Sequence, residues 1–220
     1  MPSTTVENYL KQIFLIARKS SDQVASMGAV AQAMEVVPGT ATTMAKSLAE
    51  SGLALYTPRV GITLTAEGQK IAIKMLRRHR LIEYFLVETL GMDWSEIHEE
   101  AEHLEHAISD RVLEYIDKFL GHPTTDPHGD VIPSAEGEFH FRKIEPLSEV
   151  GEGEAFVIAQ LIDQDSKFLR FAESNQLVPS TNMRLIQRDE MAACLILQFA
   201  KSERKITLGI PAAQKILVER

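Results

Sequence analysis

The chain has 220 residues, enough for one large domain or for two to three small domains with packed cores. Hydrophobic residues make up 45% and charged residues 25%, and charges interrupt every apolar run well before the roughly 20 residues of a membrane span. The single cysteine, Cys194, excludes an internal disulfide and a thiolate metal cage. The first ten residues lack the basic and apolar regions of a secretory signal, so we expect a soluble, cytoplasmic protein with no membrane partner.

The net charge of −8 is distributed unevenly along the chain. Residues 1–80 contain 10 Lys and Arg against 5 Asp and Glu, residues 81–150 contain 4 against 17, and residues 151–220 contain 9 of each. A basic first third suggests an anionic partner, and a strongly acidic middle suggests a cationic partner. An acidic, solvated helix face is the alternative explanation for the middle segment.

Three helices are predicted in the first 51 residues. Thr4 followed by Glu7 forms a capping box, and apolar residues follow at helical spacing up to residue 17. Ser26 is a predicted cap for a short helix over residues 27–34. A third helix, over residues 40–51, follows a connector in which Pro38 suits a first helical turn, and it ends at a glycine.

A hairpin follows these helices, since the apolar runs 53–56 and 62–64 flank a Pro/Gly turn with Arg59 at its tip. Helix, short helix, turn, helix and hairpin is the order of a winged helix-turn-helix, which we predict as the DNA-binding domain over residues 1–72. A small helical bundle with an incidental hairpin is the alternative. The predicted DNA-contacting residues are Pro38, Thr40, Thr42, Thr43, Lys46, Ser47 and Arg59. The helical ones offer hydroxyls and one lysine rather than bidentate base contacts, so specificity should rest partly on DNA shape.

The middle of the chain is predicted to be helical and to bind metal. A helix capped by Thr65 should run to about residue 90, and one or two further amphipathic helices should fill residues 95–120. Paired amphipathic helices usually dimerise, so residues 73–133 are predicted as a helical dimerisation and metal-binding domain. Residues 122–133 form a proline-bounded, ordered loop.

Imidazoles and carboxylates lie on one face of the predicted helices. Four such residues stand at i, i+4, i+7 and i+8, namely His98, Glu102, Glu105 and His106, and His79 and Glu83 stand at i, i+4 on the preceding helix. Such a donor set without thiolate suits manganese, iron(II) or zinc. Taken singly, each of these residues is more often a solvated surface group than a ligand. Asp126 and His128 could join a site formed by His79, Glu83 and His98, or they could simply order their loop.

The last third has a different pattern. Residues 134–152 are predicted as a linker, and five short β-runs follow at 155–162, 183–186, 193–198, 206–210 and 216–218, interrupted by one short helix at 167–172. So many short strands predict a small β-barrel over residues 153–220. The expected fold is therefore mainly α, with a C-terminal small barrel.

The stretches VENYLKQIF, RVGITLT, LRRHRLIEYFL, IHEEAEHLEH and LGHPTTDPHGDVIP, together with this order of parts, resemble the diphtheria toxin repressor family, in particular its manganese-responsive branch. The resemblance covers about residues 5–133, and it implies the family's SH3-like barrel for residues 154–220. It implies a primary metal site at Glu102, Glu105 and His106 and an ancillary site at His79, Glu83 and His98. Further ligands are implied at Asp126, His128 and, from the barrel, Asp163. Glutamate at 102, where iron-selective members have cysteine, implies manganese(II), with iron(II) as the alternative.

One departure from the family concerns the first helix, where the manganese branch usually has aspartate and glutamate but this chain has Asn8 and Lys11. Asn8 offers a neutral carbonyl oxygen as a weaker ligand, and a protonated Lys11 cannot coordinate. The resemblance implies a non-enzymatic, metal-dependent repressor that binds a palindromic operator as a homodimer and controls metal-homeostasis genes. The alternatives are a helical-bundle metalloenzyme and a metal-independent winged-helix regulator.

Overall fold

The computed structural model describes residues 3–139 and 142–220. The chain divides into two compact units. The first comprises Met1–His79, Glu105–Ser109 and Pro133–Glu138, and the second comprises Arg80–Leu104, Asp110–Ile132 and Phe139–Arg220. Because two long helices contribute residues to both units, the domain boundaries inferred from the sequence stay predictions.

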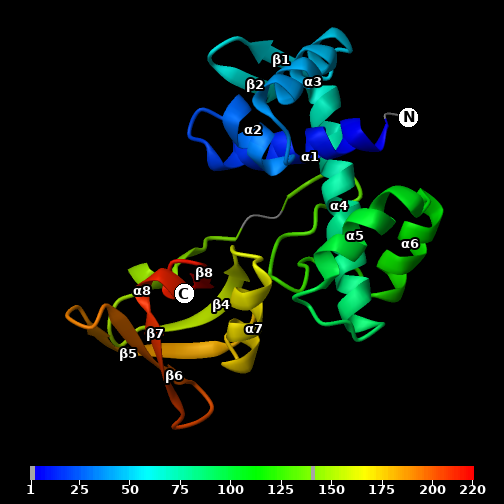
Figure 1. Ribbon diagram of the computed structural model, residues 1–220. Coiled ribbons are helices and arrows are strands. Elements are labelled where there is room, and N and C mark those ends of the chain that lie inside the picture. Colours follow the sequence, from blue (N-terminus) through cyan, green and yellow to red (C-terminus); the bar gives the residue numbers. More distant parts are fainter. Residues whose placement is uncertain (1–2, 140–141) are drawn as a thin grey trace. The chain divides into compact units, whose positions relative to one another are not determined.

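The first unit contains the predicted winged helix-turn-helix (Figure 1). Its elements are α1 (Thr4–Lys19), α2 (Met27–Ala33), α3 (Pro38–Glu50), β1 (Ala54–Thr57), β2 (Gly61–Leu64) and the first part of α4 (Ala66–Glu88). One face of each helix packs into a shared core that includes Leu10, Ile13, Val30, Leu48 and Ile62. The fold class predicted for this part is confirmed.

Most helix caps follow the sequence signals, with one correction. Ser26 Oγ accepts from the backbone N–H of Ala29, and Thr65 Oγ1 accepts from that of Gly68, as the pattern predicts. The prediction that Thr4 and Glu7 form a capping box is wrong. The cap of α1 is Ser3, whose Oγ accepts from Val6 N–H at 3.4 Å. This frees the Glu7 carboxylate for a distant partner.

The hairpin is fixed to the helical part of its unit. Strands β1 and β2 pair antiparallel, from Ala54 opposite Leu64 to Thr57 opposite Gly61. Ile62 also exchanges two backbone hydrogen bonds of 2.9 Å with Ala25, just before α2. Arg59 lies in the turn with a positive φ of 67°, a conformation that non-glycine residues adopt mainly in tight turns. The wing is therefore anchored along one strand, with Arg59 exposed near its tip.

The second unit combines helices with a β-sheet. Its helical elements are the rest of α4, the first part of α5 (Ile97–Ala107), α6 (Asp110–Phe119), α7 (Ser166–Ser174) and the short α8 (Ile210–Ala213). The strands are β3 (Glu145–Pro146), β4 (Ala155–Leu161), β5 (Asn182–Asp189), β6 (Cys194–Phe199), β7 (Lys205–Gly209) and β8 (Ile216–Glu219), with a single 3-10 turn, η1 (Leu147–Glu149). All five predicted strands and the predicted helix at 167–172 are present.

The strands form one antiparallel sheet in the order β3-β8-β4-β5-β6-β7. Within the described residues the end strands β3 and β7 do not pair, so the small C-terminal β domain is an open sheet rather than a closed barrel. Strand β3 lies in the segment that was predicted as a linker. Helix α7 lies beside β4 (Figure 1). Its Phe168 and Leu169 belong to the buried core that includes residues of the sheet. Among the described residues, no helix has the length and apolar character that crossing a bilayer requires.

Candidate metal centre and nucleic-acid interface

Three buried side chains of the second unit converge on one point. Glu83 comes from α4, and Asp126 and His128 come from the loop after α6; all three are almost inaccessible to solvent. One potential ligand atom from each lies within 4.8 Å of the other two. Burying two carboxylates side by side is costly unless a cation compensates their charge, so this group is a candidate metal centre.

The loop is folded so that Asp126 and His128 point inward. Asp126 Oδ1 accepts backbone hydrogen bonds of 2.9 Å from His128 and Asp130, which closes a tight turn. The carbonyl of His128 accepts a 2.8 Å hydrogen bond from Leu161 N–H, which fastens the turn to β4. The turn is thus closed by its own hydrogen bonds and attached to β4, a rigid support that a ligand-bearing loop requires.

His128 is oriented to present one ring nitrogen as a ligand. Its Nε2 lies 3.0 Å from the carbonyl oxygen of Trp94, and the two rings stack with centroids 5.4 Å apart. A carbonyl can only accept, so Nε2 carries the proton and Nδ1 keeps its lone pair. Nδ1 is buried and has no hydrogen-bond partner among the described residues. Metal-binding histidines are commonly oriented by a carbonyl in this way.

Charge around the cluster is strongly unbalanced. Burial raises the pKa of Asp126 well above its usual range, and the negative charges of Asp130 and Glu83 raise it further, while Arg80 lowers it. Arg80 lies 3.7 Å from Asp126 Oδ2 and 2.8 Å from Asp130 Oδ1. Asp126 and Asp130 thus share one guanidinium, and the nearby negative charge of Glu83 adds to theirs, which favours a divalent cation.

The raised pKa of Asp126 predicts a pH dependence of stability. A carboxyl whose pKa is higher in the folded state favours folding in its neutral form, so its contribution is complete below the ordinary aspartate pKa and is lost as pH rises through the raised pKa. The free energy of unfolding of the metal-free protein should therefore fall across that interval. Urea denaturation at several pH values in chelator should show this fall, and Asp126→Asn should flatten it. An identical pH profile in the variant would contradict the assignment.

His98 and Glu102 lie beside the same centre. His98 Nδ1 is 3.4 Å from Glu83 Oε1, and its Nε2 is 3.9 Å from Glu102 Oε1. The His98 side chain is 52% exposed, so it approaches Glu83 from the solvent side. His79 precedes Glu83 by one turn of α4. The predicted ancillary residues Glu83 and His98 are therefore brought together.

Of the predicted primary ligands, Glu105 and His106 lie in the first unit together with Asn8, whereas Glu102 belongs to the second unit, beside His98. His106 Nε2 lies 2.7 Å from Asn8 Oδ1 and 3.3 Å from Glu105 Oε1. Its Nδ1 lies 2.8 Å from Glu7 Oε2. Glu7 had been predicted to cap α1 instead. Lys11 Nζ donates to Glu105 Oε1 at 2.7 Å. Glu105 therefore already has a cationic partner from α1.

Asp163, the predicted ligand from the C-terminal domain, points elsewhere. Its Oδ2 lies 2.5 Å from Lys215 Nζ, and this hydrogen bond lowers the pKa of Asp163. Among residues 3–139 and 142–220 it belongs to no group of three potential ligands. Gln160 reaches the loop instead, donating to Asp130 Oδ1 at 3.1 Å.

The sequence patterns did not indicate several residues that support the candidate ligands. Arg78 Nε donates to the carbonyl of Glu105 at 2.7 Å, and Arg77 Nη1 donates to that of Pro133 at 2.6 Å. Arg80 and Trp94 support Asp126 and His128 as described above. The available signal was the run Arg-Arg-His-Arg inside an otherwise amphipathic helix, since arginines on a packed helix need acceptors.

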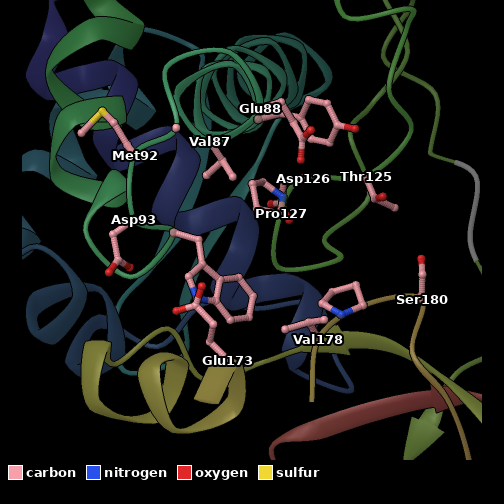
Figure 2. A pocket seen from close by; sticks show the side chains of 14 residues that line it. Val87, Glu88, Met92, Asp93, Thr125, Asp126, Pro127, Glu173, Val178 and Ser180 are labelled. Atoms are coloured by element: carbon pink, nitrogen blue, oxygen red, sulfur yellow. The ribbon is translucent and has the colours of Figure 1, made fainter. Parts of the chain in front are cut away.

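A cavity of about 560 Å³ adjoins the cluster within the second unit. Figure 2 shows Asp126 and Pro127 on its wall, with the carboxylates of Glu88, Asp93 and Glu173 also lining it. Such a lining attracts cations rather than anions. The cavity therefore adds negative potential on the side of Asp126.

All the predicted DNA-contacting residues except Arg59, which lies in the turn between β1 and β2, are on α3. Ala41, Ala45 and Leu48 are buried, whereas the predicted contacts on α3 are exposed or, for Thr42, partly exposed. Thr42 and Thr43 donate their hydroxyl hydrogens to carbonyls of Pro38 and Gly39, at 2.8 and 3.0 Å. Towards a ligand they therefore offer methyl groups and oxygen lone pairs, which suits thymine methyls better than phosphates.

Three family profiles match the chain. One described as "Iron dependent repressor, N-terminal DNA binding domain" matches residues 1–62. A second, "Iron dependent repressor, metal binding and dimerisation domain", matches residues 65–134. The third, "FeoA domain", matches residues 145–220. Together they account for nearly the whole chain.

Individual proteins agree with these profiles. The iron-dependent repressor IdeR of Mycobacterium leprae is 27% identical over 228 residues, covering 98% of this chain and 97% of that protein. The HTH-type transcriptional regulator MntR of Lysinibacillus sphaericus is 33% identical over 121 residues, covering 53% of this chain and 84% of that protein. A solved manganese-dependent transcriptional repressor in complex with manganese is 37% identical, with a TM-score of 0.86 and coverage of 97% and 98%. The manganese regulator SloR is 31% identical, with a TM-score of 0.73 and coverage of 100% and 99%.

Proposed function

We propose that this protein, when it has bound a divalent metal ion, binds a palindromic operator as a homodimer and thereby represses metal-homeostasis genes. The proposal starts from the family: the chain belongs to the iron-dependent repressor family of metal-dependent transcriptional repressors. The observation that supports this most strongly is the His128 ring, which has a buried Nδ1 without a hydrogen-bond partner among the described residues and which groups with two buried carboxylates. The family is one of repressors, which weighs against the metalloenzyme alternative.

The donor set favours manganese(II), with iron(II) as the alternative. Glu83 and Asp126 offer hard oxygen ligands, and His128 offers one imidazole nitrogen; these three contain no thiolate. His98 is the next candidate, since its ring lies against Glu83, and His79 follows at one helical turn. Two solved relatives, one named as a manganese-dependent transcriptional repressor and one as a manganese regulator, support the same choice. We leave Asp163 out of this set because Lys215 neutralises it.

The proposed role of the cluster is to fasten α4 to the loop after α6. A bound divalent ion would supply the positive charge that Glu83 and Asp126 need. With that charge compensated, α4 and the loop are held together through these two side chains. Because α4 begins two residues after β2, its position bears on the wing and on α3. Metal and DNA affinities are then coupled, typically by about 1–3 kcal/mol.

Helix α6 offers a surface for the homodimer. Val112, Tyr115 and Phe119 lie on one face of α6 and are 48%, 64% and 72% exposed. Such a run of exposed apolar side chains marks an interaction surface, and the matching family profile is named for dimerisation. A two-fold dimer would present two reading heads to the two halves of a palindrome, with half-sites about one helical turn apart.

Arg59 is expected to contact the DNA backbone from the wing. Arg59→Ala should weaken binding to all sequences alike and reduce the slope of log K against log salt by about one per protomer, because one phosphate contact is lost. Fluorescence anisotropy at several salt concentrations measures both quantities. Lys201→Ala, which removes an exposed charge after β6, is the control and should leave the slope unchanged. A normal slope in Arg59→Ala would place the wing away from the DNA.

The proposed function is tested by selecting duplexes from a random pool with the full-length protein, in manganese and in chelator. We expect enrichment of inverted repeats in manganese, and affinity for the selected duplex about 5- to 150-fold lower in chelator, which corresponds to a coupling of about 1–3 kcal/mol. Equal affinity in both conditions would instead support a metal-independent winged-helix regulator.

A further inference from the structure

The predicted primary metal site contains an ammonium group supplied by the chain itself. Lys11 faces inward from α1 and is 2% exposed, and Glu105 on α5 is fully buried. Their Nζ and Oε1 atoms are 2.7 Å apart. A lysine is rarely buried to this degree unless a carboxylate pairs with it, so this ion pair is a structural element of the interior of the first unit.

Both oxygens of Glu105 are already engaged. Oε1 accepts from Lys11, and Oε2 lies 2.7 Å from His79 Nδ1. His106, the neighbouring predicted ligand, is held between Glu7 and Asn8 at 2.8 and 2.7 Å. The residues that should surround a metal ion therefore satisfy each other around Lys11. They do not fit a divalent ion as they stand.

Electrostatics makes the two cations mutually exclusive. A metal ion bound to Glu105 Oε1 would lie about 2.0–2.2 Å from that oxygen, within a few ångströms of the ammonium that donates to the same atom. Two positive charges at that distance in a buried site repel strongly. Binding would require Lys11 to leave, and a displaced ammonium would need another acceptor or a route to water.

We propose that Lys11 is a built-in counter-ion for Glu105 that replaces the metal ion of the primary site and confines metal binding to Glu83, Asp126 and His128. The inference rests on the proposed function in one respect, namely that Glu83, Asp126 and His128, called the second site below, bind the metal ion. It assigns one metal ion to each protomer. It also makes the link between α1 and α5 a permanent ion pair instead of a metal bridge.

The test is the number of manganese ions bound per protomer, measured by equilibrium dialysis of the full-length protein followed by metal analysis. The wild type should bind one ion. Lys11→Gln, which removes the charge, should bind two, whereas Lys11→Arg, which keeps it, should bind one. Lys19→Gln, an exposed lysine on the same helix, is the matched control and should bind one. Circular dichroism verifies that each variant is folded.

The outcomes separate this inference from the proposed function. Two ions in the wild type, or no additional ion in Lys11→Gln, would overturn the inference while leaving metal binding intact. No ion in the wild type but one in Lys11→Gln would support the built-in counter-ion and refute the second site. If Lys11→Gln does not fold, Glu105→Gln decides, since it should still bind one ion and a loss of that ion would overturn the inference.

Discussion

His128→Ala should lower the affinity for manganese at least about 100-fold. Losing a residue that only supports a ligand typically lowers metal affinity by about 10- to 100-fold, and losing a ligand itself should cost at least as much. The imidazole supplies the only nitrogen of the group formed with Glu83 and Asp126, and its Nδ1 has no other partner among the described residues. Removing it leaves two buried carboxylates with too few ligands to hold an ion. Isothermal titration with manganese measures the loss, and metal-stimulated DNA binding should disappear with it.

The matched control is His122→Ala, which removes another imidazole near the start of the same loop. His122 is exposed, and its ring is paired with Asp117 at 2.9 Å, away from the cluster. Its manganese affinity should stay within about twofold of wild type, as expected for a surface substitution that touches no ligand. A similar loss in both variants would indicate damage to the loop rather than loss of a ligand. Unchanged affinity in His128→Ala would remove His128 from the site.

Gly129→Ala should destabilise the protein by about 2–5 kcal/mol, combining the strain of a left-handed backbone with overpacking. Gly129 has a φ of +88°, and a Cβ built on it would lie 2.0 Å from the carbonyl oxygen of Ala159. The neighbouring contacts are also backbone atoms, which cannot rotate away. Urea denaturation measures the loss of stability. Manganese affinity should fall too, because the small size of Gly129 lets the turn that carries Asp126 and His128 lie against β4.

Gly121→Ala separates strain from crowding. Gly121 also has a positive φ, +73°, but no atom lies within 4 Å of its added Cβ. It should lose only about 1 kcal/mol, the cost of the backbone conformation alone. If both glycine variants lost the same stability, close approach of the loop to β4 would not be what requires glycine at position 129.

Local signals in the sequence were sufficient to predict most of the fold. The caps at Ser26 and Thr65 and the apolar periodicities correctly predict the positions of α2, α3, α4 and the five longer strands. Strand β3 was missed because two residues carry no alternation pattern; pairing with Leu217 and Val218 defines it. The Thr4 capping box failed because Ser3 is an equally good cap one residue earlier.

The candidate site was less accessible to sequence reasoning. Helical spacing correctly places Glu83 on the face of α4 that carries the predicted ligands. A loop has no such periodicity, so the sequence does not predict the inward orientation of Asp126 and His128, which depends on a turn and on a hydrogen bond to β4. Lys11 was recognised only as a residue unable to coordinate. The pairing of its ammonium with Glu105 requires contact between α1 and α5. The two residues are 94 positions apart in the sequence, so no local pattern predicts this contact.

The central claim is that Glu83, Asp126 and His128 hold the regulatory metal ion. Anomalous diffraction above and below the manganese absorption edge, on crystals of the full-length protein grown with manganese, locates the ion directly. We predict one anomalous peak per protomer, within bonding distance of these three side chains, with Lys11 still paired to Glu105. A peak between Glu105 and His106, with none beside His128, would contradict the account.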